Sequence, residues 1–120
     1  MAMIVEEPDA AVESLAAAAC LFHGFSDVSR LRILQHLLLG EHRVVELTEH
    51  LGLAQSTVSK HLACLKDCGL VTSRPVGRAS MFSVAHPEAT TELLAAAERL
   101  LDVTGYAVTL CPNHGLGAHV

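Results

Sequence analysis

The sequence predicts a mainly α-helical domain that carries one small β-hairpin. Helices are favoured because the chain is 51% hydrophobic while holding only three Phe, one Tyr and no Trp, so its apolar content is largely Ala and Leu. The hairpin is indicated by residues 70–84, where β-prone runs flank Pro75-Val76-Gly77-Arg78. A chain of 120 residues has length for a single domain with a modest core.

The first two helices are predicted from composition and spacing. Residues 10–25 are rich in Ala, which has the highest helix propensity, and Gly24 ends the run. Ser26 or Asp27 can then cap a second helix over Val28–Leu39. On this second helix we expect a core-facing stripe formed by Val28, Leu31, Leu34 and Leu38.

Two short helices follow, joined by a tight turn at Gly52. The first is expected over residues 43–51, and the second over residues 54–68, where Gly69 provides a stop. The apolar face of the first consists of Val45, Leu47 and Leu51. Two short helices around a glycine turn are typical of a helix-turn-helix, and the hairpin at 70–84 then becomes its wing.

The helix at residues 54–68 carries two separate stripes when 100° is counted per residue. The core-facing stripe consists of Val58, Leu62 and Leu65. The other stripe, centred roughly 90° away, consists of Thr57, His61, Cys64 and Cys68. The two cysteines are therefore not simply core residues, and at i and i+4 both sulfurs can reach one metal ion.

The last predicted helix covers residues 87–106 and has an apolar face wide enough to pair with a second copy of the chain. That face consists of Leu93, Leu94, Ala97, Leu100 and Leu101. After it the chain becomes irregular and contains Cys111, His114 and His119. We expect one domain over residues 1–106 and a tail over 107–120 that carries a candidate metal ligand, Cys111.

Charge is distributed unevenly along the chain, whose formal net charge is −5. Residues 1–26, 27–78 and 79–120 carry net charges of −4, +2 and −3, so nearly all Lys and Arg lie in the middle segment. A nucleic-acid contact would thus be local and salt-sensitive. The acidic N-terminus and the lack of a long apolar run predict a cytoplasmic protein with no membrane contact, in which four cysteines stay reduced.

Three segments resemble the ArsR/SmtB family of metal-sensing winged-helix repressors. They are FSDVSRLRIL at 25–34, VVELTEHLGLAQSTVSKHLACLKDCGLV at 44–71 and SRPVGRASMFSV at 73–84. The resemblance implies a homodimeric winged helix-turn-helix that binds double-stranded operator DNA when metal-free and releases it on binding metal. By that reading the chain is not an enzyme, and no nucleophile–base pair or phosphate-binding loop appears in it.

The candidate DNA contacts lie on the recognition helix and the wing. Short polar side chains at the start of that helix are placed to meet base edges: Gln55, Ser56, Thr57, Ser59 and Lys60. Arg74 and Arg78 flank the turn of the wing and are expected to touch phosphates or the minor groove. We assign His61 to the DNA contacts too, although from its stripe it could instead complete a metal site.

The candidate metal site follows from the same resemblance, because the run HLACLKDCGLV is most similar to the cadmium- and lead-sensing members. Their three-sulfur site maps to Cys64, Cys68 and Cys111, with Cys111 reaching it from the same chain or from a partner. Thiolates favour soft ions, so Cd or Pb is expected as effector, with Zn or Hg as alternatives. Cys20 is expected in the core or a dimer interface, and His114 and His119 are at most auxiliary ligands.

A second interpretation keeps the fold and changes the signal. In it, a disulfide formed by Cys64 and Cys68, or by one of them with Cys111, makes the protein a thiol-redox-sensing repressor. A response to metal that survives strong reductant distinguishes the two.

Overall fold

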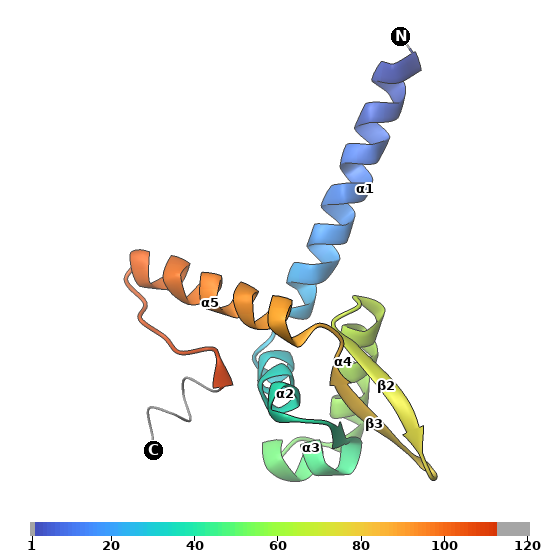
Figure 1. Cartoon of the computed structure of the whole chain (residues 1–120), viewed down its shortest axis with the longest axis vertical. Helices are drawn as coiled ribbons and strands as arrows, with labels where there is room; N and C mark the ends of the chain where they lie inside the picture. The colour runs from blue at the N-terminus through green and yellow to red at the C-terminus, as the bar shows by residue number, and fades with distance from the viewer. Residues whose placement is uncertain (1, 113–120) are drawn as a thin grey trace.

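The computed structural model describes the backbone of residues 2–112 and the side chains of residues 10–112. Along the chain the elements are α1 (Ala2–Gly24), α2 (Val28–Leu39), β1 (His42–Arg43), α3 (Val44–Leu51), α4 (Gln55–Asp67), β2 (Val71–Val76), β3 (Ala79–Val84) and α5 (Pro87–Val103). Figure 1 shows α2, α3 and α4 gathered beside the β2–β3 hairpin, while α1 and α5 extend away from them. The expected mainly α-helical fold with one hairpin, a winged helix-turn-helix, is confirmed.

Helix α2 begins where a cap was expected. Of the two candidate caps, Asp27 fills the position, because its carboxylate accepts a 3.1 Å hydrogen bond from the Arg30 backbone N–H. That bond is the main reason why the pKa of Asp27 lies below its usual value. Val28–Leu39 matches the predicted bounds.

The buried stripe of α2 differs from the predicted one. Of the predicted stripe, Leu34 is confirmed as buried and Leu31 and Leu38 are half buried, whereas Val28 is 74% exposed. The other buried side chains of α2 are Arg30, Ile33 and Leu37. The difference arises because α2 packs against α3, α4 and β3 along the face that contains Arg30. The predicted stripe leaves out Arg30, because charged residues are rarely buried. It is therefore centred on a face of α2 closer to Val28 than the face that is buried.

The helix-turn-helix follows the predicted pattern closely. Gly52 ends α3 in the left-handed region at φ 67°, which glycine adopts without strain. The α4 stripe of Val58, Leu62 and Leu65 is confirmed as the centre of the core, with each side chain at most 1% exposed. On α3, Leu47 and Leu51 are buried as expected, but Val45 is about half exposed.

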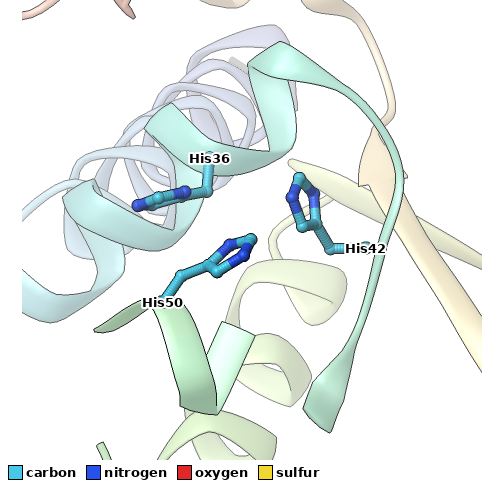
Figure 2. A group of neighbouring side chains, drawn as sticks. All are labelled: His36, His42 and His50. Carbon is cyan, nitrogen blue, oxygen red and sulfur yellow. The ribbon is translucent and has the colours of Figure 1, made fainter. Parts of the chain in front are cut away.

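The sheet has the strand order β1-β3-β2 and is antiparallel throughout. The predicted hairpin is confirmed, with Val71 opposite Val84 and a turn at Gly77, whose φ is 61°. The two-residue strand β1 was not predicted because so short a strand shows no alternation of apolar and polar residues. Its pairing with β3 places the His42 ring beside the rings of His36 and His50 (Figure 2).

The outer helices leave much of their apolar surface uncovered in the single chain. On α1, Val12, Leu15 and Phe22 are exposed, and on α5 Leu94 is buried while Leu100 is 67% exposed. Helix α5 ends at Val103, three residues before the predicted position. Among the described residues, no helix is both long and apolar enough to cross a bilayer.

The correction to α2 can be tested with two substitutions on the same helix. Leu34→Ala removes a side chain with no exposed surface, and we expect it to lower the free energy of unfolding by about 2–5 kcal/mol. Val28→Ala should change it by less than about 0.5 kcal/mol, because the Val28 side chain is exposed. Urea unfolding at one fixed protomer concentration measures both. A loss above about 1 kcal/mol for Val28→Ala would show that this side chain packs in the core, as the predicted stripe requires.

Candidate DNA interface and thiol cluster

The recognition helix α4 presents its polar residues to the outside. Its apolar stripe is fully buried, which fixes the rotation of the helix about its own axis. The side chains left exposed at its N-terminal end are Gln55, Ser56, Ser59 and Lys60. Four of the six DNA contacts expected on this helix therefore share one open edge.

Two of the expected DNA contacts, Thr57 and His61, are only half exposed. His61 faces α2, where its Nδ1 lies 3.4 Å from Arg30 Nη1 and its Nε2 lies 3.7 Å from Asp27 Oδ2. A guanidinium can only donate, so Nδ1 is the acceptor and the ring proton sits on Nε2, toward the carboxylate. His61 therefore lies apart from the open edge, in a contact between α4 and α2.

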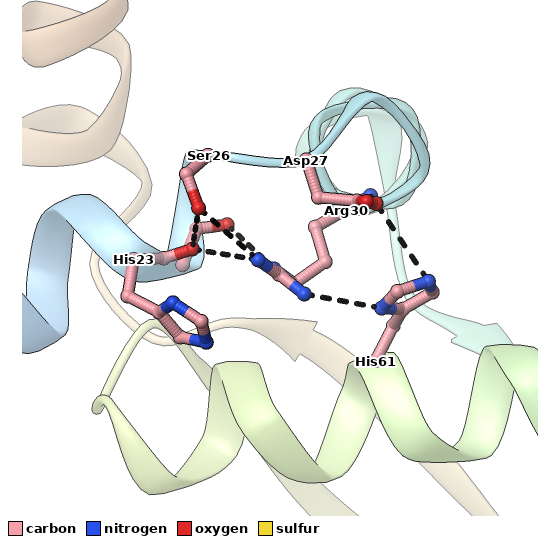
Figure 3. A network of polar contacts seen from close by, with 6 residues as sticks. His23, Ser26, Asp27, Arg30 and His61 are labelled. Atoms are coloured by element: carbon pink, nitrogen blue, oxygen red, sulfur yellow. Dashed lines mark hydrogen bonds and ion pairs between the residues drawn. The ribbon is translucent and has the colours of Figure 1, made fainter.

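Arg30 is the centre of this contact, as Figure 3 shows. Its guanidinium donates to the backbone carbonyls of His23 (2.8 Å) and Gly24 (3.3 Å) and to the Ser26 hydroxyl (3.3 Å). The two carbonyls belong to the C-terminal end of α1, whose last carbonyls have no partner within the helix. Arg30 thus joins α1, α2 and, through His61, α4. Sequence reasoning missed it, although an arginine at core spacing on an amphipathic helix was a usable signal.

The two wing arginines are both exposed but differ in their surroundings. Arg74 on β2 forms two hydrogen bonds with the Glu41 carboxylate, at 2.8 and 2.9 Å. This pairing lowers the pKa of Glu41 and raises that of Arg74. Arg78 lies in the turn beside Gly77. The wing therefore carries one arginine on β2 that is held by Glu41 and one in the turn.

The C-terminal end of α4 is fixed in a way that determines where the cysteine pair lies. Gly69 adopts φ 77°, and the N–H groups of Gly69 and Leu70 donate back to the carbonyls of Lys66 and Leu65. This pair of bonds is a Schellman motif, which satisfies the last carbonyls of a helix. Cys68 stands at the C-cap, one turn after Cys64, and both side chains are half buried.

A third cysteine joins this pair from a different helix. The Cys68 thiol donates to the backbone carbonyl of Cys20 on α1 at 3.0 Å. Interaction with the Cys20 side chain, then burial and the nearby Cys64, raises the pKa of Cys68 to about 12. Cys20, expected in the core or at a dimer interface, is exposed in the single chain. Its place could not be read from the sequence, because nothing in the Ala-rich helix relates its register to α4.

Cys111, the third expected ligand, lies elsewhere in the single chain. It is buried, its backbone N–H donates to the Glu98 carboxylate at 2.9 Å, and its sulfur lies 3.8 Å from the Thr91 carbonyl. Burial and Glu98 raise its pKa. Cys68 instead lines a hollow with Thr90 and Leu93, on another face of α5. One chain therefore does not bring Cys111 to the pair, and His114 and His119 lie outside the described residues.

Comparison with known proteins adds independent observations. The model of the family described as bacterial regulatory protein, arsR family, matches residues 27–73. A probable mercury resistance operon repressor from Streptomyces lividans is 44% identical over 69 residues, which are 58% of this chain and 55% of that protein. The HTH-type transcriptional regulator CmtR of Mycobacterium tuberculosis is also 44% identical over 69 residues, 58% of each chain.

Solved structures agree with the sequence relatives. The NMR structure of CmtR, a cadmium metal sensor, has a TM-score of 0.54 at 40% identity and covers 63% of this chain and 82% of that one. A homodimeric winged helix-turn-helix DNA-binding domain from Mycobacterium bovis has a TM-score of 0.68 at 28% identity, covering 76% of this chain and 83% of that one. The chain spans a little over half the length of the curated relatives it matches.

The raised pKa of Cys68 predicts low reactivity of this thiol. The thiolate is the nucleophile, and a pKa near 12 in place of 9.0 leaves very little thiolate at pH 8. We expect iodoacetamide to modify Cys68 at least about tenfold more slowly than the same residue in the urea-unfolded chain, even allowing for the higher nucleophilicity of a less acidic thiol. Mass spectrometry of tryptic peptides over time measures the rate at each cysteine. Comparable rates in the folded and unfolded chain would show that the thiol cluster does not perturb Cys68.

Proposed function

The chain belongs to the arsR family of bacterial regulatory proteins, and from this we propose that it is a homodimeric repressor that releases operator DNA on binding a soft divalent metal ion. The observation that carries the proposal is the construction of α4. Its N-terminal end exposes Gln55, Ser56, Ser59 and Lys60, and its C-terminal end holds Cys64 and Cys68. One rigid helix thus joins the surface that would read DNA to the thiols that would bind metal.

DNA binding is proposed for the open edge of α4 and for the wing. Helix α4 would lie in the major groove with its first two turns at the base edges, and Arg74 and Arg78 would contact the backbone. Thr57 is included at the margin of this surface. His61 would contribute indirectly, by holding α4 against α2 through Arg30 and Asp27.

Dimerisation is proposed through α1 and α5, within a DNA-binding and dimerisation unit that spans residues 1–106. Large apolar side chains on both helices are exposed in the single chain, among them Phe22 on α1 and Leu100 and Val103 on α5. Covering them removes apolar surface from water, and a two-fold dimer presents two copies of α4 to two half-sites. The domain of known structure from Mycobacterium bovis is homodimeric, which supports this arrangement.

The metal site is proposed at Cys64 and Cys68, with Cys111 as the third ligand. Within one chain Cys111 lies on a different face of α5, so the tail over residues 107–120 of a partner would have to bring it. Thiolates favour Cd, Pb and Hg over harder ions, and Zn also binds them. A relative described as a cadmium sensor and another described as a probable mercury resistance repressor support that choice.

The redox alternative needs a reactive thiolate at the site. The raised pKa of Cys68 makes this thiol a poor starting point for oxidation, so an oxidant would have to attack another cysteine of the site first. A metal ion can displace the proton of a thiol, because coordination stabilises the thiolate directly. The relatives described as a cadmium sensor and as a probable mercury resistance repressor favour metal over oxidant as the signal.

The release of DNA can be tested with the cysteine variants. We expect Cys64→Ser and Cys68→Ser to bind the protein's own promoter as tightly as the unaltered chain but to lose release by Cd²⁺, because each removes one sulfur. A coupling free energy of about 1–3 kcal/mol corresponds to a change in operator affinity of roughly 5- to 150-fold. Electrophoretic mobility shift with and without Cd²⁺, in strong reductant, measures the change.

Two further variants define the third ligand in the same assay. Cys111→Ser should weaken Cd²⁺ binding or uncouple it from DNA release, whereas Cys20→Ser should leave release intact if Cys20 only neighbours the site. Release by an oxidant alone, with no response to Cd²⁺ in reductant, would favour the redox repressor. Normal release by Cd²⁺ from both the Cys64 and the Cys68 variants would place the metal site elsewhere.

The DNA contact can be tested through its salt dependence. If Lys60 neutralises one phosphate, Lys60→Ala should weaken binding and reduce the slope of log K against log salt by about one unit. Lys66→Ala is the matched control, because Lys66 lies at the other end of α4 and donates to Ser73 on the wing. Fluorescence anisotropy at several salt concentrations measures both slopes. An unchanged slope for Lys60→Ala would show that this end of α4 does not meet the duplex.

A further inference from the structure

Three histidines from three different elements converge on one point, away from the cysteines. His36 lies in the last turn of α2, His42 on β1 and His50 in the last turn of α3. Figure 2 shows the three side chains as neighbours, with His36 on α2 and His50 on α3. One ring nitrogen from each can be chosen so that all three lie within 4.8 Å of one another, and ring centroids are 5.4 to 6.2 Å apart.

The hydrogen bonding of His42 prepares one of these rings as a ligand. Its Nδ1 lies 2.7 Å from the Gly40 backbone carbonyl, which can only accept, so Nδ1 carries the proton. Nε2 is then left with a free lone pair. A histidine that binds a metal through one nitrogen usually donates from the other to a carbonyl or carboxylate, which fixes its tautomer and orientation.

The electrostatic surroundings also favour a cation over three protonated rings. The last turns of α2 and α3 carry His36 and His50, and the C-terminal end of a helix has a partial negative charge. The hydrogen bond from the Arg43 backbone N–H is the main reason why the pKa of the Glu46 carboxylate is lowered, and His42 and His50 lower it further. Partial burial, then His50, His42 and Arg32, lower the pKa of His36.

Little movement would be needed to close the cluster on an ion. Three nitrogens bound at about 2.0–2.1 Å in tetrahedral geometry lie about 3.3 Å apart, so each would move by about 1 Å or less from the present arrangement. Rotation about side-chain torsions can supply such a shift. His50 is exposed while His36 and His42 are half buried, so a fourth position would open to solvent and admit water.

We propose that His36, His42 and His50 form a second metal site, distinct from the cysteine site, for a borderline divalent ion of the zinc class. Imidazole nitrogens suit Zn²⁺, Ni²⁺, Co²⁺ and Cu²⁺, whereas the thiols on α4 suit softer ions. The ion would tie the end of α2, strand β1 and the end of α3 together. Those elements pack against α4 and the wing, so the bound ion would stabilise the whole helix-turn-helix.

The test uses Zn²⁺ itself, with the full chain in which Cys20, Cys64, Cys68 and Cys111 are all replaced by Ser. This background removes the thiols, and the additional changes His114→Ala and His119→Ala remove the tail imidazoles. We expect isothermal titration calorimetry to show one Zn²⁺ per chain and thermal unfolding to shift to higher temperature with Zn²⁺. His42→Ala should weaken binding at least about tenfold and abolish the thermal shift, since loss of a residue that merely orients a ligand already costs about 10- to 100-fold in metal affinity.

Two further variants separate Zn²⁺ binding at the histidine cluster from the loss of any one imidazole and from misfolding. His86→Ala removes an exposed imidazole at the start of α5, outside the cluster, and should leave Zn²⁺ affinity unchanged. His50→Ala alters an exposed ring and so keeps the test valid if His42→Ala fails to fold, as judged by circular dichroism. Zn²⁺ affinity that survives both His42→Ala and His50→Ala, or that falls equally with His86→Ala, would overturn the proposal.

Discussion

The arrangement of the helices depends on the burial of one guanidinium. Arg30 is 9% exposed and lies at a core position of α2. A buried charge is costly unless its donors are satisfied, and here they meet the carbonyls of His23 and Gly24, the Ser26 hydroxyl and the His61 ring. The angle at which α1 leaves the domain is therefore set by the same group that positions α4.

For the proposed function, the contacts of α1 with α4 offer a physical route from the metal site to DNA. Helix α1 meets α4 at two places, through Arg30 and His61 at one and through the contact of Cys20 with Cys68 at the other. A metal ion bound at the proposed site would displace the proton of Cys68 and its hydrogen bond to the Cys20 carbonyl. Loss of that bond would act on α1, the helix proposed for the dimer interface. The spacing of the two recognition helices would then change with the angle of α1, without any change inside α4.

The sequence predicted the local structure well and the lateral contacts poorly. Helix bounds followed from Asp27, Gly52 and Gly69, whose effects on the backbone are local, and the α4 core stripe followed from periodicity. Arg30 was missed because its burial depends on partners from α1 and α4. The same limit applied to the thiol cluster, where i and i+4 spacing placed Cys64 with Cys68 but could not place Cys20. Contacts between segments distant in sequence depend on packing angles that no local pattern encodes.

The charges around the wing bear on how much coupling free energy between metal and DNA binding the proposed repressor would need. The Glu41 carboxylate already binds Arg74, so a phosphate must compete with it, and the acidic termini leave a net charge of −5. Operator affinity should therefore rest mainly on contacts made by the exposed edge of α4 and by Arg78, rather than on general attraction to DNA. Binding that depends on the correct placement of two helices is lost when their spacing shifts, because few nonspecific contacts remain to hold the duplex. A repressor with weak background attraction can thus be released by a coupling of only about 1–3 kcal/mol.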